Sequence, residues 1–178
     1  MAMISLADAV HLRARILAYR SELDAARRRG TTVLVQKGEA PDTPSTTVEQ
    51  YTEQMAEASA DYRMLDVAMA RLNLDNRVTW DGHEIPLMEA LQLAKDLRQQ
   101  ISELKTLGAR LKVQRLRPGT MGRDGGDFVE VAMYDPEAMR KQADQLERQV
   151  MRLSRLIDRC NEDVMFDYPP AVKYMAFD

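Results

Sequence analysis

The sequence predicts an all-α protein, an elongated antiparallel four-helix bundle with a small β-hairpin cap at one end. The first observation is a spacing, because four stretches of the chain carry an apolar residue every three and then four places. This spacing puts a narrow apolar stripe on one side of a helix, as in coiled coils and helical bundles. The second is composition, since 45% apolar and 30% charged residues fit a folded helical chain. We expect one domain at residues 1–166 of the 178.

The first helix is predicted at about residues 5–29. Ser5 is a suitable N-cap, and Asp8 completes a capping box three residues later. Gly30 ends the helix as a residue that tolerates the left-handed conformation. The apolar stripe of this helix consists of Ala9, Leu12, Ile16, Tyr19, Leu23 and Ala26.

A short strand and a second helix follow. Residues 31–36 read TTVLVQ, a β-branched run that predicts one strand, and residues 37–45 have the composition of a loop. The second helix, at about residues 46–74, begins near Thr47 with Gln50 as its capping partner. Its stripe consists of Val48, Tyr51, Met55, Ala58, Tyr62, Leu65, Met69 and Leu72.

Residues 76–85 predict a β-hairpin, because Asp81-Gly82 suits a two-residue turn in which both residues have positive φ. We expect Val78 and Trp80 to pack on the end of the bundle. Pro86 opens the third helix, at about residues 86–111, where its missing N–H costs nothing. The stripe of this helix consists of Leu87, Ala90, Ala94, Leu97, Ile101, Leu104, Gly108 and Leu111.

Residues 112–134 predict a β-hairpin, because alternate positions near its end are apolar. Asp135-Pro136 then starts the fourth helix, at about residues 135–165. Up-and-down order puts the ends of the first and third helices together, so we expect the strand at 31–36 to join this hairpin in a three-stranded cap. The fourth stripe consists of Met139, Ala143, Leu146, Val150, Leu153, Ile157, Cys160 and Val164.

The chain resembles a family of small bacterial proteins of unknown function that is sometimes labelled septicolysin-like. The resemblance covers most of residues 5–166. Four segments carry it: LADAVHLRARI, VLVQKGEAP, ARLNLDNRVTWDGHEIPLMEALQLAKDL and DPEAMRKQADQLERQVMRLSRLIDRCNEDV. It implies a bundle of long helices with hairpin insertions and supplies no catalytic residues. The loop at 115–134 is longer than the family pattern, and the tail at 167–178 is an addition, so either is expected to carry a function specific to this protein.

Composition narrows the class of protein. No apolar run reaches the roughly 18 residues of a membrane span, and the N-terminal residues lack the basic region of a secretory signal. We therefore expect a cytoplasmic protein with no membrane partner, encoded by a bacterial chromosome or a phage.

The single cysteine, Cys160, is expected to be a buried, inert thiol. A net charge of −3 gives no general attraction to nucleic acid.

The sequence carries no recognisable catalytic or metal-binding motif. Nucleophile-elbow, Walker and Cys–His patterns do not occur. His11 and His83 are the two histidines, and Asp81 and Glu84 lie near His83. Side chains that alternate along a hairpin point to opposite faces, so these groups are not expected to converge on a metal. We expect no enzymatic activity, no catalytic residues, no metal and no cofactor.

Two helices carry stripes of one charge. The basic stripe on the fourth helix consists of Arg148, Arg152, Arg155 and Arg159, and the acidic stripe on the second consists of Glu49, Glu53, Glu57 and Asp61. Like charges four residues apart weaken an isolated helix. Either the acidic stripe of one copy docks near the basic stripe of another, or both are ordinary solvated faces.

A set of cations is expected where the first and third helices end. It consists of Arg27, Arg28, Arg29, Lys37, Arg110, Lys112, Arg115, Arg117 and Arg123. Part of this set is explained by the helix dipole, which favours cations at helix C-termini. Converging guanidinium groups would also suit a small phosphorylated ligand such as a nucleotide. Nucleic acid is not expected, because stacking aromatics and a groove-reading helix are not evident.

The tail is too apolar to remain in water. Either its aromatic residues pack back on their own chain, or they reach a neighbouring copy, with Tyr168, Tyr174 and Phe177 as contacts. Apolar residues outside the stripes favour self-association. The leading hypothesis is a non-enzymatic, homo-oligomeric binding or assembly protein. The alternative is an oligomer that sequesters a small anionic ligand at the basic end.

Overall fold

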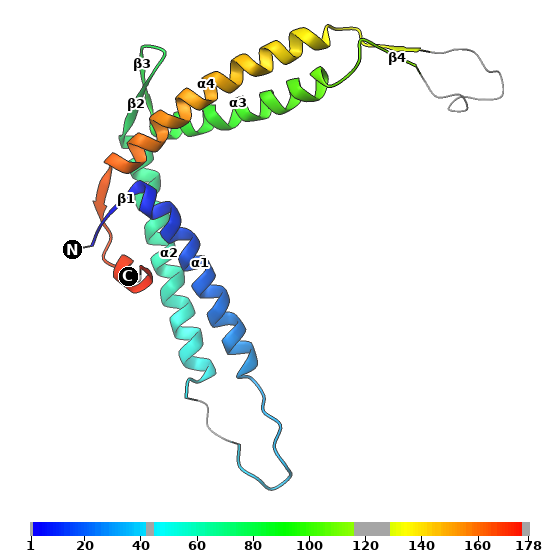
Figure 1. Ribbon diagram of the computed structural model, residues 1–178. Helices are drawn as coiled ribbons and strands as arrows, with labels where there is room; N and C mark the ends of the chain where they lie inside the picture. Colours follow the sequence, from blue (N-terminus) through cyan, green and yellow to red (C-terminus); the bar gives the residue numbers. More distant parts are fainter. Residues whose placement is uncertain (1, 42–44, 116–128, 176–178) are drawn as a thin grey trace, which may run out of the picture. The chain divides into compact units, whose positions relative to one another are not determined.

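The computed structural model describes residues 2–41, 45–115 and 129–175, and the chain is mostly helical (Figure 1). The helices of the described residues are α1 (Leu6–Arg29), α2 (Val48–Asp75), α3 (Leu87–Gly108), α4 (Pro136–Asp163) and the short α5 (Ala171–Tyr174). The strands form three two-stranded sheets: β1 (Met3–Ser5) with β6 (Met165–Asp167), β2 (Arg77–Trp80) with β3 (His83–Pro86), and β4 (Val113–Arg115) with β5 (Val129–Val131). The predicted helical class is confirmed.

The chain divides into two compact units. Unit 1 combines Met1–Arg77 with Asp158–Asp178, and unit 2 is the continuous segment Val78–Ile157. The four predicted helix ranges overlap α1, α2, α3 and α4. One domain at residues 1–166 and one bundle of four helices both stay predictions.

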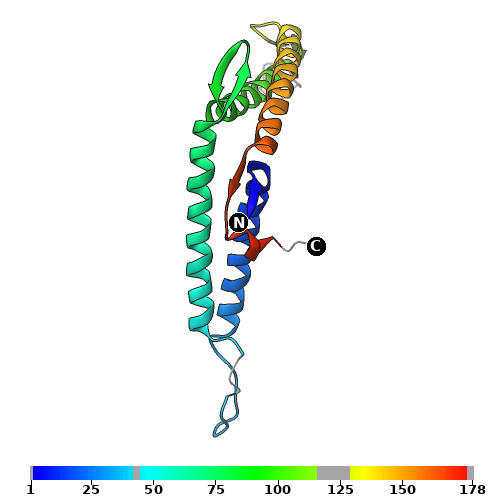
Figure 2. The same cartoon turned by 90° about the vertical axis from the view of Figure 1, so that its left-hand side faces the viewer.

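In unit 1, α1 packs against α2, and the two helices lie side by side (Figure 2). Arg13 of α1 reaches across to α2, where its Nε lies 2.9 Å from the hydroxyl of Tyr62 and 3.0 Å from Asp66 Oδ1. The buried core of this unit combines both helices with both ends of the chain: Ile4, Ala9, Leu12, Ile16, Ala58, Leu65, Tyr168 and Ala171.

The helix starts confirm the predicted caps. Ser5 Oγ accepts a 3.0 Å hydrogen bond from the Asp8 N–H, and the Asp8 carboxylate accepts one of 3.1 Å from the Ser5 N–H. Thr47 and Gln50 form the same reciprocal pair at the start of α2. Gly30 ends α1 as predicted, but its φ of −82° is not left-handed, so the expected conformation at this position is wrong.

Residues 31–36 do not form the predicted strand. They are irregular, and the Val33 and Leu34 side chains are 62% and 102% exposed. A strand is stabilised by ladder hydrogen bonds to a neighbour, and the described residues supply no strand partner to this segment. The predicted three-stranded cap is therefore wrong, and β4 and β5 form a sheet of two strands.

In unit 2, the predicted hairpin at 76–85 is confirmed. Asp81 and Gly82 have φ values of 46° and 83°, the positive values that a two-residue turn requires. Arg98 of α3 donates a 2.8 Å hydrogen bond to Ser154 Oγ of α4, and Lys105 pairs with Glu147, so α3 and α4 run antiparallel. The buried members of this pair include Leu87, Ala90, Ala94, Leu97, Ile101, Ala143, Leu153 and Ile157.

Candidate binding surfaces

The structure shows neither a membrane-spanning helix nor a metal cluster in the residues that it describes. None of those helices is both long enough and apolar enough to cross a bilayer. Groups of three or more His, Cys, Asp and Glu side chains suited to a metal ion do not occur within residues 2–41, 45–115 and 129–175. The expectations of no metal and no enzymatic activity stay predictions.

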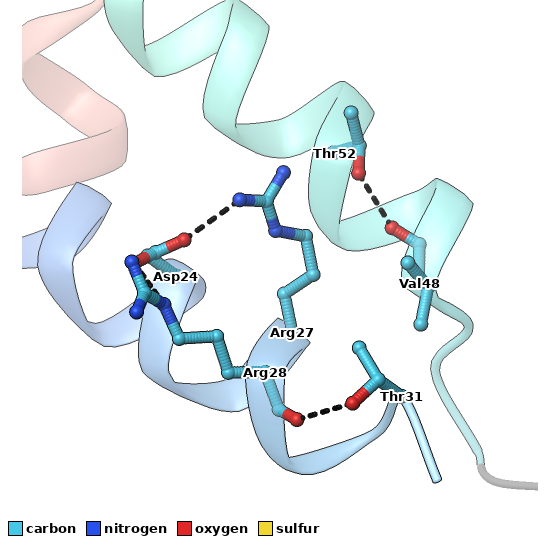
Figure 3. Close-up of polar contacts among 6 residues, drawn as sticks. All are labelled: Asp24, Arg27, Arg28, Thr31, Val48 and Thr52. Atoms are coloured by element: carbon cyan, nitrogen blue, oxygen red, sulfur yellow. Dashed lines mark hydrogen bonds and ion pairs between the residues drawn. The ribbon is translucent and has the colours of Figure 1, made fainter.

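At the end of α1, the predicted anion-binding cations have a partner in their own helix (Figure 3). Arg27 Nη2 lies 2.8 Å from one carboxylate oxygen of Asp24, and Arg28 Nε lies 2.8 Å from the other. The Thr31 hydroxyl donates to the Arg28 carbonyl oxygen, which stabilises the last turn of α1. Two of the predicted cations therefore share one carboxylate of their own helix, and cations in the last turn are what the helix dipole favours.

The cations near the β4–β5 hairpin are also engaged. Arg110 Nη1 lies 3.4 Å from Glu130 Oε1, and Lys112 Nζ donates to the carbonyl oxygens of Ala132 and Tyr134 at 2.8 and 2.7 Å. Arg115 is in β4, whereas Arg117 and Arg123 lie outside the described residues. Arg27, Arg28, Arg29 and Lys37 belong to unit 1, and Arg110 and Lys112 to unit 2. One anion site built from both sets stays a prediction.

The β4–β5 hairpin has an apolar face in solvent. Its strands pair Val113 with Val131 and Arg115 with Val129, so the three valines belong to one face, which they share with Arg115. Val113, Val129 and Val131 are 53%, 50% and 47% exposed. The flanking Leu111 and Met133 are exposed as well. We call Val113, Val129 and Val131 the valine face. The sequence predicted the hairpin but not this surface.

The other face of the hairpin has a polar character. Gln114 is paired with Glu130 in the register. A cavity of about 280 Å³ lies on this side and is lined by Arg110, Leu111, Gln114, Glu130 and Ala132. Because Arg110 and Glu130 already form an ion pair, the cavity offers little net charge to a ligand.

A second cavity, of about 340 Å³, lies between the β2–β3 hairpin and α4 in unit 2. It is lined by Thr79, Trp80, Asp81, Arg152, Arg155 and Leu156, and we call it the Trp80 groove. The Arg152 guanidinium carbon lies 5.2 Å from the centre of the Trp80 ring, a cation–π contact. Arg152 Nη2 also lies 3.7 Å from Asp81 Oδ1. Two members of the predicted basic stripe thus line a groove that also contains an aromatic ring.

The other two members of the basic stripe do not line this groove. Arg148 lies about one turn before Arg152 on α4, and Arg159 Nε lies 3.8 Å from Asp163 Oδ2. The acidic stripe on α2 is partly used within its own chain, because Lys173 Nζ lies 2.8 Å from Glu57 Oε2 and 3.8 Å from Asp61 Oδ2. Docking of one stripe on the other between copies stays a prediction.

The tail packs on its own chain, the first of the two interpretations offered for it. Tyr168 is 2% exposed and donates a 2.8 Å hydrogen bond to the Asp61 carbonyl oxygen. The Tyr174 ring contacts Tyr19 of α1 edge to face, with 5.6 Å between ring centres. β6 and α5 were not predicted in this segment. Phe177 lies outside the described residues.

Cys160 is less buried than predicted. It lies on α4 with intermediate exposure, and it is a free thiol. Partial burial, with a smaller contribution from the Asp163 charge, raises the pKa of this thiol. The thiolate fraction is therefore small at neutral pH, so low reactivity is still expected although full burial is wrong.

This fold, a mostly helical chain with small antiparallel strand pairs, has a counterpart among solved structures. A crystal structure of a functionally unknown conserved protein from Corynebacterium diphtheriae superimposes with a TM-score of 0.69. The match is 22% identical in sequence and covers 93% of this chain and 100% of that one. At this identity the likeness shows the fold alone.

Searches by sequence add no relative. No protein-family model matches the chain, and the search of curated proteins finds no significant match. The septicolysin-like resemblance therefore stays a prediction. A structural neighbour of unknown function is consistent with the unknown function of that family.

Proposed function

We propose that this chain is a non-enzymatic assembly protein that associates with further copies of itself through the β4–β5 hairpin. The observation that carries the proposal is the valine face, three half-exposed β-branched residues on a sheet of only two strands. A two-stranded hairpin without further packing is marginally stable in water. A second hairpin packed face to face against the first would cover the apolar side chains of both valine faces.

The wider surface supports association. Among the described residues, the exposed large apolar side chains outnumber the large apolar side chains that are buried. Scattered apolar residues are normal on a monomer, but contiguous ones favour a protein partner. The hairpin meets this criterion best, because its three valines share one face and Leu111 and Met133 flank it.

The register separates the valine face from the charge of Glu130. Gln114 is paired with Glu130, and successive residues of a strand belong to opposite faces, so Glu130 lies on the face opposite the three valines. Two hairpins that pack valine face to valine face around a two-fold axis would cover the valines of both copies without bringing two copies of Glu130 together. This is the arrangement that we propose.

The test is a measurement of mass against concentration by light scattering after size-exclusion chromatography and by sedimentation. We expect a species of twice the 20.3 kDa chain mass. The double variant V113T/V131T keeps β-branched side chains but replaces four apolar methyl groups per dimer with hydroxyls, and burial of a methyl group is worth about 0.8 kcal/mol. We expect the dissociation constant of the dimer to rise about 100-fold in V113T/V131T. In V113I/V131I we expect it to fall.

The matched control is Val67→Thr, an exposed valine on α2 that lies outside the hairpin. It should leave the mass unchanged. A wild-type chain that remains monomeric at every concentration would overturn the proposal. The proposal would also be overturned if V67T and V113T/V131T weakened the dimer equally, because the contact would then not be specific to the valine face.

A further inference from the structure

We propose that the Trp80 groove binds a small aromatic anion, with its phosphate or carboxylate between Arg152 and Arg155. The inference is independent of self-association, because no residue of the groove belongs to the β4–β5 hairpin. The groove's volume of about 340 Å³ lies within the range of small-molecule sites.

The two arginines lie on one face of α4. Arg152, Arg155 and Leu156 are three and four residues apart, the spacing that makes neighbours on a helix surface. Arg152 is held by the Trp80 ring at 5.2 Å and by Asp81 at 3.7 Å. Its guanidinium is therefore positioned before any ligand arrives, which reduces the entropy cost of binding.

Arg155 is the member of the groove with unused charge. Within the part of the chain that the structure describes, no hydrogen bond or ion pair engages its side chain. Asp81 is the acidic residue that lines the groove, and it faces Arg152. Among the residues that line the groove, two guanidinium groups against one carboxylate leave a net charge of +1. An anion is the ligand that this charge favours, and guanidinium groups bind phosphate and carboxylate oxygens with strong hydrogen bonds.

Trp80 and Leu156 add the apolar half of the site. Trp80 is partly buried at the end of β2, directly before the Asp81-Gly82 turn, and Leu156 lies on α4 beside Arg155. A ring packs well against an indole and against a guanidinium plane. An aromatic anion therefore uses both halves of the groove, whereas a free inorganic ion uses only the arginines.

Trp80 also gives a direct readout, because it is the one tryptophan in the sequence. We would titrate the intact protein with phenyl phosphate, benzoate, inorganic phosphate and phenol and record tryptophan fluorescence. Phenyl phosphate or benzoate should change the Trp80 emission, and the change should saturate as the compound is added. The compound that binds more tightly shows whether the groove prefers a phosphate or a carboxylate. Inorganic phosphate and phenol should each bind at least about tenfold more weakly, because each lacks half of the ligand.

Three variants separate the groove from the rest of the helix. R155Q removes the unpaired charge and should weaken phenyl phosphate or benzoate binding about tenfold. D81N keeps the turn, because Asn-Gly suits it as well as Asp-Gly, and should tighten binding about threefold by removing the competing carboxylate. R148Q is the matched control, one turn away on α4 but outside the groove, and should bind as the wild type does.

Two results would overturn the proposal. One is an emission that no aromatic anion changes, since a ligand in the groove cannot avoid Trp80. The other is binding that R155Q and R148Q weaken to the same extent, which indicates general attraction to a basic helix. Circular dichroism of each variant checks that α4 is still folded, so that a loss of binding reports on the groove.

Discussion

The Tyr174 hydroxyl donates a 2.6 Å hydrogen bond to Oδ2 of Asp61, which lies 113 positions earlier in the sequence. Asp61 is thereby joined to the tail twice, because its backbone carbonyl oxygen accepts from Tyr168. Lys173 Nζ lies 3.8 Å from the same carboxylate and partly balances its charge. Residues 168–174 thus form an integral part of unit 1.

Tyr174→Phe should destabilise unit 1 without changing its fold. The substitution removes a hydrogen bond to a charged acceptor, and such bonds contribute about 1.5–3 kcal/mol. The measurement is urea unfolding followed by circular dichroism. Tyr51→Phe on α2 is the control, because its hydroxyl has no hydrogen-bond partner among the described residues, and it should be neutral. Equal stability of Y174F and wild type would mean that the tail contributes nothing to unit 1.

Alkaline pH should also weaken the attachment of the tail. Burial, with a contribution from the Asp61 charge, raises the pKa of Tyr168 to about 12. An unfolded tyrosine loses its proton near pH 10. The stability from burying a neutral phenol is therefore fully present below pH 10 and is lost as the pH rises towards 12. The unfolding temperature of wild type should fall more steeply above pH 10 than that of Y168F. If the unfolding temperatures of both proteins fall in parallel with pH, the loss of stability does not come from Tyr168.

Gly108→Ala should destabilise unit 2, although alanine is the better helix former by about 1 kcal/mol. A Cβ at this position would lie 2.6 Å from Arg140 Cγ and 3.2 Å from the Arg140 backbone nitrogen. Overpacking of this kind costs about 1–3 kcal/mol.

The matched control for that variant is Gly30→Ala. Its Cβ would meet nothing closer than 3.6 Å, and its φ of −82° suits any residue. Thermal unfolding should show G30A unchanged or slightly stabilised. Stabilisation by G108A would mean that α3 and α4 are not in close contact at Arg140.

Acid should remove the cap of α1. Hydrogen bonds from the Ser5 side chain and backbone lower the pKa of Asp8 below the ordinary value of an aspartate. The stability from this carboxylate is therefore present above the unfolded-state pKa of about 4 and is lost as the pH falls through the lower folded-state value. In D8N the stability of the folded protein should lack this part of its decrease with falling pH.

Ser5→Ala tests the same cap at neutral pH. Loss of the N-cap side chain should cost about 1 kcal/mol in the free energy of unfolding. Thr106→Ala is the control, because the Thr106 hydroxyl bonds a carbonyl oxygen inside α3 and caps nothing. It should be neutral, so an equal loss in both variants would argue against the capping box.

Local chemistry was predictable where the causes lie within a few residues. The Asp81-Gly82 turn and the Ser5 and Thr47 capping boxes each depend on neighbours in the sequence, and all three are present. The stripes likewise identify buried residues such as Leu65 and Leu153, because the helical repeat alone puts them on one side.

Apart from the left-handed conformation expected at Gly30, which was a local error, the main errors and omissions concern contacts between distant residues. The strand predicted at 31–36 has suitable residues but no partner, and propensity alone does not supply one. The pairing of β1 with β6 joins Met3 to Asp167 through segments of three residues, too short to show a period. The contact between Trp80 and Arg152 depends on how the hairpin lies against α4, which neither segment encodes alone.

The chain order of the two units has a consequence for synthesis on the ribosome. Unit 2 is continuous, whereas β1 and α1 are translated first and receive β6, Tyr168 and Ala171 only when the last segment emerges. Unit 2 can complete its contacts while unit 1 still lacks part of its core. Until then Ile4, which pairs with Phe166 in the folded protein, presents apolar surface to chaperones, so a pause in translation before residue 158 prolongs the period in which the nascent chain is most exposed to aggregation.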